Sequence, residues 1–204
     1  MPDTNHPARR CNLFAYLLGV VVMKLFRWKV EGRVPDSKKM IIIAAPHTTN
    51  WDFIFLLGAA YCFRLSINWL GKNTMFPPVV GAFFKFLGGV PVDRSKNTNL
   101  VQTLAETIKQ ADNFTLIIPP AGTRRRTDYW KSGFYQIALA TQIPIVCGYL
   151  DYAKKIACLG MSFVPTGNVK SDMDRIRDFY RPITGKYPEN TSTILLKEED
   201  ASSA

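Results

Sequence analysis

Short apolar runs bounded by polar turns recur along the chain and predict buried strands. These runs cover 39–45, 67–71, 89–93, 114–119, 144–152 and 155–163. The first reads KMIIIAA, which is typical of a strand that is covered on both faces. The last two runs lie close together, so they are expected to pair with each other.

Longer apolar or amphipathic stretches between these runs predict helices. They cover 51–64, 76–88, 97–111, 131–141 and 171–180. Leu100, Leu104 and Ile108 share one face of the third stretch, and Asn97 is expected to cap it. Ser171, which precedes two acidic residues, is expected to cap the last helix.

The alternation of these elements predicts an α/β fold, with a central mixed, largely parallel sheet flanked by helices. A chain of 204 residues without internal repeats fits one such domain, which we place at 30–185. An N-terminal hydrophobic helix is expected within 1–29. Residues 186–204 are expected to form a C-terminal tail, frayed at its end KEEDASSA.

The N-terminal segment contains an uninterrupted apolar run at 13–23. Eleven residues are too few to cross a bilayer, which takes about 20. Two interpretations stay open: a helix lying in the membrane interface, or a helix buried in the core. Basic residues bracket the run and Trp28 suits a headgroup boundary, which favours the interface. The basic residues are Arg9, Arg10, Lys24, Arg27 and Lys29.

The net charge of +10 and a pI of about 9.6 favour an anionic partner. Nucleic acid, an anionic lipid surface and a phosphorylated small molecule all qualify, and so does a merely solvated basic surface. The cysteines form no CxxC pair, so they predict reduced thiols of a cytosolic protein rather than disulfides or a metal site. They are Cys11, Cys62, Cys147 and Cys158.

His47 and Asp52, in the stretch PHTTNWD, follow the predicted strand 39–45. Histidine is suited to proton abstraction near neutral pH, and a carboxylate commonly orients such a base. From these two residues alone, a structural role and a catalytic role both remain open. The chain has no GxSxG nucleophile, so a catalytic His47 would act on a substrate hydroxyl.

Basic residues follow several other predicted strands. Arg94 follows the strand 89–93, Arg124 to Arg126 follow 114–119, and Lys72 follows 67–71. Ligands gather at the carboxyl ends of strands in open α/β sheets, and arginine pairs well with phosphate oxygens. These residues predict an anion site, although an arginine triplet is also typical of a solvated surface.

Five stretches in this order resemble the motif blocks of the glycerolipid acyltransferases, most nearly the lysophosphatidate acyltransferases. They read HTTNWD, GKNTMF, GGVPVDRS, PPAGTRRR and IPIV, and the resemblance runs from about 30 to 185. It implies that His47 deprotonates the acceptor hydroxyl, which attacks an acyl thioester, while Asp52 orients His47. The thioester, of coenzyme A or of acyl-carrier protein, is a co-substrate, and the resemblance implies no metal or bound cofactor.

The resemblance also implies roles for residues that bind substrate. Arg94 and Lys72 would contact the acceptor phosphate, Ala121 to Arg124 would line the acceptor site with Gly122 and Thr123 between them, and Pro144 with Ile145 would shape the acyl pocket. Lysophosphatidate would be the acceptor and phosphatidate the product. A peripheral or monotopic protein on the cytoplasmic face of an anionic membrane is expected, with no role in nucleic-acid binding.

The sequence departs from this pattern at two positions. Pro46 stands where the family has asparagine, and Ala121 stands where it has glutamate. The alanine is compatible with an engineered loss of activity, with a different lyso-lipid acceptor, or with a protein that binds anionic lipid or phosphate without turnover. A nucleic-acid binder is disfavoured, because Trp51, Phe83 and Phe84 lie in apolar helical runs.

Overall fold

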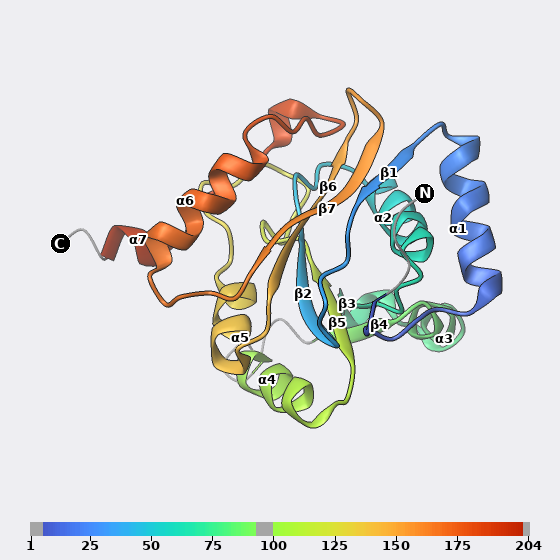
Figure 1. Ribbon diagram of the computed structural model, residues 1–204, viewed down its shortest axis with the longest axis horizontal. Coiled ribbons are helices and arrows are strands. Elements are labelled where there is room, and N and C mark those ends of the chain that lie inside the picture. The colour runs from blue at the N-terminus through green and yellow to red at the C-terminus, as the bar shows by residue number, and fades with distance from the viewer. Residues whose placement is uncertain (1–5, 93–99, 202–204) are drawn as a thin grey trace.

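The computed structural model of the chain describes residues 6–92 and 100–201 (Figure 1). Its centre is a seven-stranded mixed sheet in the order β1-β7-β6-β2-β5-β3-β4, in which β7 pairs antiparallel with β6 and the other pairs are parallel. This confirms the predicted fold class. The strands are β1 Lys29–Gly32, β2 Lys39–Ala44, β3 Asn68–Lys72, β4 Gly89–Val92, β5 Phe114–Ile118, β6 Ile145–Asp151 and β7 Ile156–Phe163.

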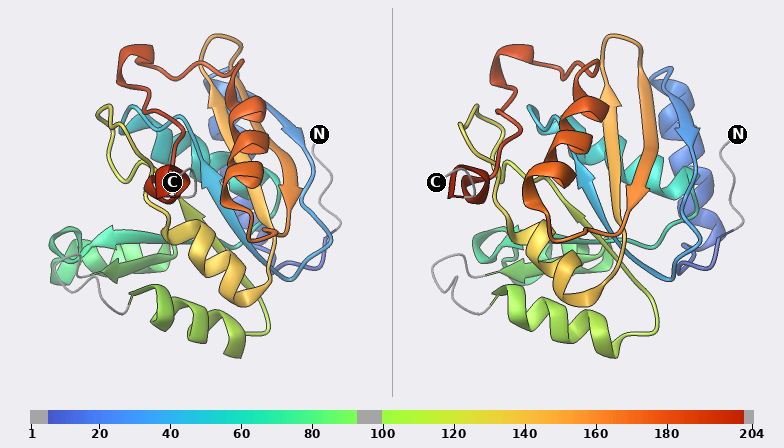
Figure 2. Two further views of the ribbon diagram at one scale, coloured as in Figure 1. Left: turned by 90° about the vertical axis from the view of Figure 1, so that its left-hand side faces the viewer. Right: turned by 60° about the vertical axis from the view of Figure 1, so that its left-hand side comes forward.

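Helices cover both faces of this sheet (Figures 1 and 2). On one face lie α1 and α2, and on the other lie α4, α5 and α6. The helices are α1 Leu13–Leu25, α2 Trp51–Cys62, α3 Pro78–Phe86, α4 Leu100–Gln110, α5 Gly133–Thr141, α6 Val169–Tyr180 and α7 Lys197–Ala201, with 3₁₀ turns at Asn73–Met75 and Pro188–Asn190.

The side chains of β2 point alternately into two hydrophobic cores. Ile41 and Ile43 pack with α4, α5 and α6, whereas Met40 and Ile42 pack on the side of α2. All four are buried, as the run KMIIIAA predicts for a strand covered on both faces. The residues that follow β2 therefore emerge where the two cores meet.

The N-terminal helix α1 packs one face against α2 and exposes the other. Gly19 and Gly58 lie at the contact, where a Cβ added to Gly19 would be 2.7 Å from the Gly58 carbonyl oxygen. The apolar side chains that α1 exposes are Leu13, Phe14, Leu17, Leu18, Val21 and Leu25. One face of the helix is therefore packed against the protein, and the other presents apolar side chains outward, where the interface interpretation stays a prediction.

Trp28, which follows the N-terminal helix, is buried inside the protein. Trp28 is 7% exposed and packs on Phe55 with ring centroids 4.8 Å apart, so its assignment to a membrane headgroup boundary is wrong. The indole ring packs against aromatic rings inside the protein instead, those of Phe55 and Tyr152. Within 6–92 and 100–201, no helix has both the length and the apolar character needed to cross a membrane.

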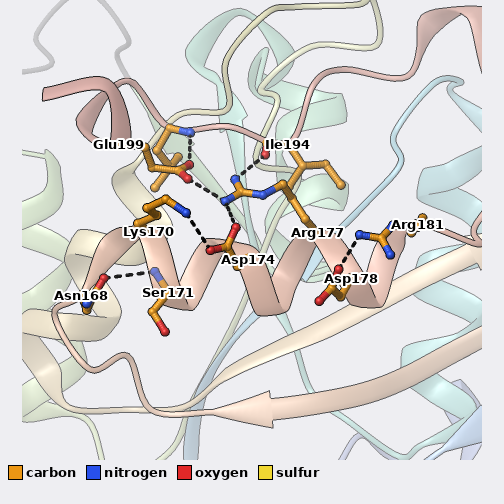
Figure 3. Close-up of polar contacts among 10 residues, drawn as sticks. Asn168, Lys170, Ser171, Asp174, Arg177, Asp178, Arg181, Ile194 and Glu199 are labelled. Carbon is orange, nitrogen blue, oxygen red and sulfur yellow. Dashed lines mark hydrogen bonds and ion pairs between the residues drawn. The ribbon is translucent and has the colours of Figure 1, made fainter. Parts of the chain in front are cut away.

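Most of the predicted C-terminal tail is packed against the domain. Leu196 is fully buried, and the Trp130 amide donates to the Leu195 carbonyl over 2.8 Å. Arg177 of α6 donates to the Ile194 carbonyl and pairs with Glu199, as Figure 3 shows. The expectation that the end frays is therefore wrong for residues 197–201, which form α7.

The helix caps differ in part from the prediction. Helix α6 begins two residues earlier than expected, and its cap is Asn168, whose Oδ1 accepts from the Ser171 amide over 3.1 Å (Figure 3). Ser171 is therefore not the cap. The predicted cap of α4, Asn97, lies outside the described residues.

The contact between α1 and α2 can be tested with a matched pair of substitutions. Gly19→Ala places a methyl group against the backbone of α2, so it should lower the free energy of unfolding by about 1–3 kcal/mol. Gly133→Ala, at the start of α5 where nothing lies within 4 Å of the added Cβ, should be neutral or stabilise by up to about 1 kcal/mol. Urea unfolding measures both, and a Gly19→Ala protein as stable as the parent would contradict the docking of α1.

Candidate active site

The parallel strands β2 to β6 end at one edge of the sheet, and His47 lies there, three residues beyond β2. The chain then turns into α2, so Asp52 falls in the first turn of that helix. The His47 Nδ1 lies 3.0 Å from the Asp52 Oδ2. The structure thus brings together the two residues that the spacing singled out.

The Asp52 carboxylate is almost fully buried, at 3% exposure, and accepts four hydrogen bonds. Its Oδ2 accepts from the amides of Thr48, at 2.8 Å, and Thr49, at 3.0 Å, and from the His47 ring. Its Oδ1 accepts from the Tyr152 hydroxyl at 2.6 Å. Burial of an ionised carboxylate needs such compensation, and these four donors provide it.

This arrangement determines which ring nitrogen of His47 can accept a proton from a substrate. An ionised carboxylate only accepts hydrogen bonds, so Nδ1 carries a proton and Nε2 is the nitrogen that can take one from a substrate. The His47 side chain is 20% exposed, whereas the Asp52 side chain is 4% exposed. The imidazole is therefore the more accessible of the two groups.

His47 lines two cavities. The first is apolar and lies between α2 and the sheet, and it suits an alkyl chain. The second is more polar and lies between the end of β2, the loop after β5 and the C-terminal segment. Besides His47, the first is lined by residues including Ile42, Leu56, Ala59, Phe63, Tyr149 and Leu159, and the second by residues including Ala121, Trp130, Tyr180, Thr191 and Ser192.

The loop after β5 forms a tight turn beside His47. Gly122 adopts φ +67° and its amide donates to the Pro119 carbonyl over 3.0 Å. Ala121 is buried on the wall of the second cavity, whereas Arg124 is exposed. The Thr123 hydroxyl accepts from the Arg125 amide, so it holds the turn.

Four predicted site residues remain to be placed: Lys72, Arg94, Pro144 and Ile145. Lys72 ends β3, exposed, at the same edge of the sheet as His47 but two strands away from β2. Arg94 lies outside the described residues. Pro144 and Ile145 stand at the start of β6, and the Pro144 carbonyl accepts from the Ile41 amide.

The prediction that Pro144 and Ile145 shape the acyl pocket is therefore not supported by their positions. They lie at the opposite edge of the sheet from His47, and neither lines either cavity. Ile145 is fully buried in the core under α5 and α6. The physical reason is that β6 runs parallel to β2, so its first residues lie beside the start of β2 rather than its end.

Sequence reasoning missed several neighbours of the dyad. Tyr152 is 100 residues from Asp52, and its only signal is its place at the end of a predicted strand. The C-terminal segment also reaches the site, where the Tyr187 amide donates to the Thr48 hydroxyl over 3.2 Å and Lys186 lies 5.6 Å from the Trp51 ring. Lys131 lies against Gly122, since a Cβ there would be 3.1 Å from the lysine Cε.

The four cysteines are free thiols. Burial raises the pKa of Cys62 to about 11 and that of Cys147 to about 12, so neither is a thiolate near neutral pH. In the part of the chain that the structure describes, no group of three or more histidine, cysteine or acidic side chains is placed to hold a metal ion.

Comparisons with known proteins identify relatives of this chain. The acyltransferase family model matches residues 27–150, which include His47, Asp52 and Tyr149 but not Tyr152. A 1-acyl-sn-glycerol-3-phosphate acyltransferase of Streptococcus pneumoniae (strain ATCC BAA-255 / R6) is 26% identical over 143 residues, covering 65% of this chain and 52% of the relative.

Two further relatives carry the same name. The Saccharomyces cerevisiae protein is 31% identical over 126 residues (58% of this chain, 41% of the relative), and that of Escherichia coli (strain K12) is 26% identical over 141 residues (65% and 56%). The chain thus spans about half the length of the curated relatives that it matches.

A solved structure shares the fold. The crystal structure of the 1-acyl-sn-glycerophosphate (LPA) acyltransferase PlsC from Thermotoga maritima aligns with a TM-score of 0.54 at 18% identity, covering 83% of this chain and 74% of the other. The family match covers well over half of the chain and contains the dyad. The chain belongs to the acyltransferase family.

Proposed function

We propose that the chain transfers a fatty acyl group from a thioester to the free hydroxyl of a lysophospholipid at a membrane surface. One observation carries this proposal: the His47–Asp52 pair stands between an apolar cavity and a more polar one. A base at such a boundary can serve one substrate from each side. The names of the relatives make lysophosphatidate the first acceptor to test.

The chemistry follows from the nitrogen that His47 presents. The acceptor hydroxyl gives its proton to Nε2 as its oxygen attacks the thioester carbonyl carbon. The tetrahedral intermediate then expels the thiolate, which takes the proton back from the imidazolium. Asp52 holds the ring in place and stabilises its positive charge between the two steps.

In this proposal each substrate approaches His47 from one side. The alkyl chain of the acyl donor would enter the cavity between α2 and the sheet, where apolar side chains replace water. The acceptor would lie against the loop that carries Ala121, with Lys72, Arg124 and Lys131 as cations available for its phosphate. The donor is the thioester of coenzyme A or of acyl-carrier protein.

Ala121 bears on how active this chain is. Glutamate at this position would border the cavity that His47 also lines, whereas a methyl group accepts no hydrogen bond from an acceptor. One missing hydrogen bond to a bound polar group costs about 0.5–3 kcal/mol, which is about a two-fold to 150-fold loss of rate. We therefore expect a weakened enzyme. The second candidate function, binding of anionic lipid or phosphate without turnover, rests on the same alanine.

The membrane surface enters the proposal through α1. Its exposed apolar side chains continue through Phe26, whose ring lies 6.0 Å from that of Trp51 at the start of α2. Trp51 is 43% exposed and stands in the same turn as Asp52. Lys24 and Arg27 are exposed at the end of α1. An apolar face with basic residues beside it is typical of peripheral or monotopic binding to anionic lipid on a cytoplasmic face.

Acyl transfer to lysophosphatidate in detergent micelles tests the function. Labelled acyl thioesters of coenzyme A and of acyl-carrier protein would be given to the parent chain, to Ala121→Glu, and to Ala121→Glu combined with His47→Ala. We expect Ala121→Glu to raise the rate by about 10- to 100-fold and the loss of His47 to abolish it, because the base is gone.

The second candidate function makes a different prediction for the same proteins. If Ala121→Glu restores no transfer to any lyso-lipid tried, while lipid binding survives His47→Ala, the enzymatic proposal is contradicted and binding without turnover is the better account. His6→Ala is a control for general loss of histidine, since His6 is buried against the Phe63 carbonyl and lines neither cavity.

Vesicle sedimentation tests the membrane-facing role of α1. Phe14→Glu combined with Val21→Glu places two charges on the exposed apolar face and should weaken binding to vesicles containing phosphatidylglycerol by at least about ten-fold. Thr103→Glu combined with Gln110→Glu adds the same charge on the exposed face of α4 and is the matched control. Equal binding by both double variants would show that α1 does not face the lipid.

A further inference from the structure

Tyr152 occupies a rigid position next to the dyad, in the turn that follows β6. Its amide donates to the Thr184 carbonyl over 2.9 Å. The turn itself is held by Asp151, which is buried and whose Oδ1 accepts from the amides of Ala153 at 3.0 Å and Lys154 at 3.3 Å. The backbone of Tyr152 is therefore fixed on both sides of the residue.

The ring of Tyr152 is fixed as well. It meets the Trp28 ring edge-on, with centroids 5.0 Å apart and an interplanar angle of 89°, and the Phe55 ring at 6.2 Å and 72°. Trp28 and Phe55 are both buried. Edge-to-face contacts of this kind restrict how a ring can turn, so the hydroxyl group has a defined position.

That hydroxyl donates to one oxygen of the Asp52 carboxylate. It reaches the Asp52 Oδ1 at 2.6 Å, while Oδ2 accepts from His47 and from the two threonine amides. With both oxygens held, the carboxylate cannot rotate away from the imidazole. We propose that Tyr152 is a positioning residue that completes a Tyr152–Asp52–His47 relay, outside the segment that the family model matches.

The phenol acts in this relay as a hydrogen-bond donor. Burial, followed by the hydrogen bond to Asp52, raises the pKa of Tyr152 well above its usual value, so the hydroxyl keeps its proton. By sharing the charge of Asp52, it limits how strongly the carboxylate holds a proton on His47. Both proton transfers of the proposed reaction involve this pair, because the imidazole takes the acceptor proton and the imidazolium returns it to the leaving thiolate. This last consequence rests on the proposed function, whereas the geometry does not.

Titratable and charged groups approach the dyad from several elements, and each bears on its response to pH. The C-terminal segment brings Tyr187 and Lys186 near it, and β6 and β7 bring Tyr149 and Cys158 to the cavity that His47 lines. Tyr180 of α6 borders the second cavity, but its hydroxyl donates to the carbonyls of Ile43 and Gly148. Unlike these groups, Tyr152 donates a hydrogen bond directly to Asp52.

Nuclear magnetic resonance of the histidine rings tests the relay without any need for activity. The chain has two histidines, so the His47 signals can be assigned against His6. In Tyr152→Phe the carboxylate loses a donor and holds the imidazolium more tightly, so the His47 signals should titrate at a pH higher by on the order of half a unit. The Phe ring keeps the contacts with Trp28 and Phe55.

Tyr135→Phe is the matched control. Tyr135 is buried and donates its hydroxyl to another buried carboxylate, the Asp172 Oδ2, at 2.8 Å. The substitution removes the same kind of bond at a site away from the dyad, so it reproduces the loss of stability but should leave the His47 titration unchanged. A His47 titration that moves equally in both variants, or in neither, would overturn the relay.

Kinetics add a second readout in the Ala121→Glu background. Tyr152→Phe should lower kcat by about 10- to 100-fold with little change in KM for the thioester, and should move the acid limb of the kcat profile to higher pH. If no background transfers acyl groups but the ring titration still shifts, the proposed function fails and the relay stands. Should Tyr152→Phe not fold, 3-fluorotyrosine at position 152, a stronger donor, should shift the titration to lower pH, and an unchanged titration there would also overturn the relay.

Discussion

The structure around the site depends on satisfying one buried carboxylate. An ionised Asp52 taken out of water without partners would cost several kcal/mol, so the fold is stable only if donors converge on it. They come from the loop after β2 and from the turn after β6, where Tyr152 is 100 residues from Asp52. The contacts that make this burial tolerable are the same contacts that orient His47. Stability and the orientation of the base therefore have a common origin.

The position of β2 in the sheet explains why the site has two sides. The side chains of β2 pack into two separate cores, and the chain leaves the strand where those cores meet. One cavity borders the core under α2 and is apolar, and the other is closed by the C-terminal segment and offers hydroxyl groups. In the proposed reaction the apolar cavity would hold the acyl chain of the donor and the more polar cavity the acceptor, and His47 lines both cavities.

Much of this arrangement can be predicted from the sequence, because the strands are continuous apolar runs and because a helix start after β2 brings Asp52 back toward His47. What could not be predicted depends on tertiary contacts. Tyr152 reaches Asp52 only once β6 lies beside β2, and Trp28 resembles an interfacial residue until Phe55 covers it. The polar segment KEEDA has the composition of a tail, yet Glu199 is buried by its bonds to Arg177 and the Leu196 amide. Pro144 and Ile145 sit in a strand whose direction decides which edge they occupy.

The most direct test of the account is a crystal structure of the protein with lysophosphatidate and a thioether analogue of the acyl thioester, which cannot react. The account predicts the alkyl chain in the cavity between α2 and the sheet, and the acceptor hydroxyl about 2.6–3.2 Å from the His47 Nε2, on the side of Ala121. An alkyl chain bound elsewhere, with no acceptor hydroxyl within reach of His47, would contradict the assignment of His47 as the base.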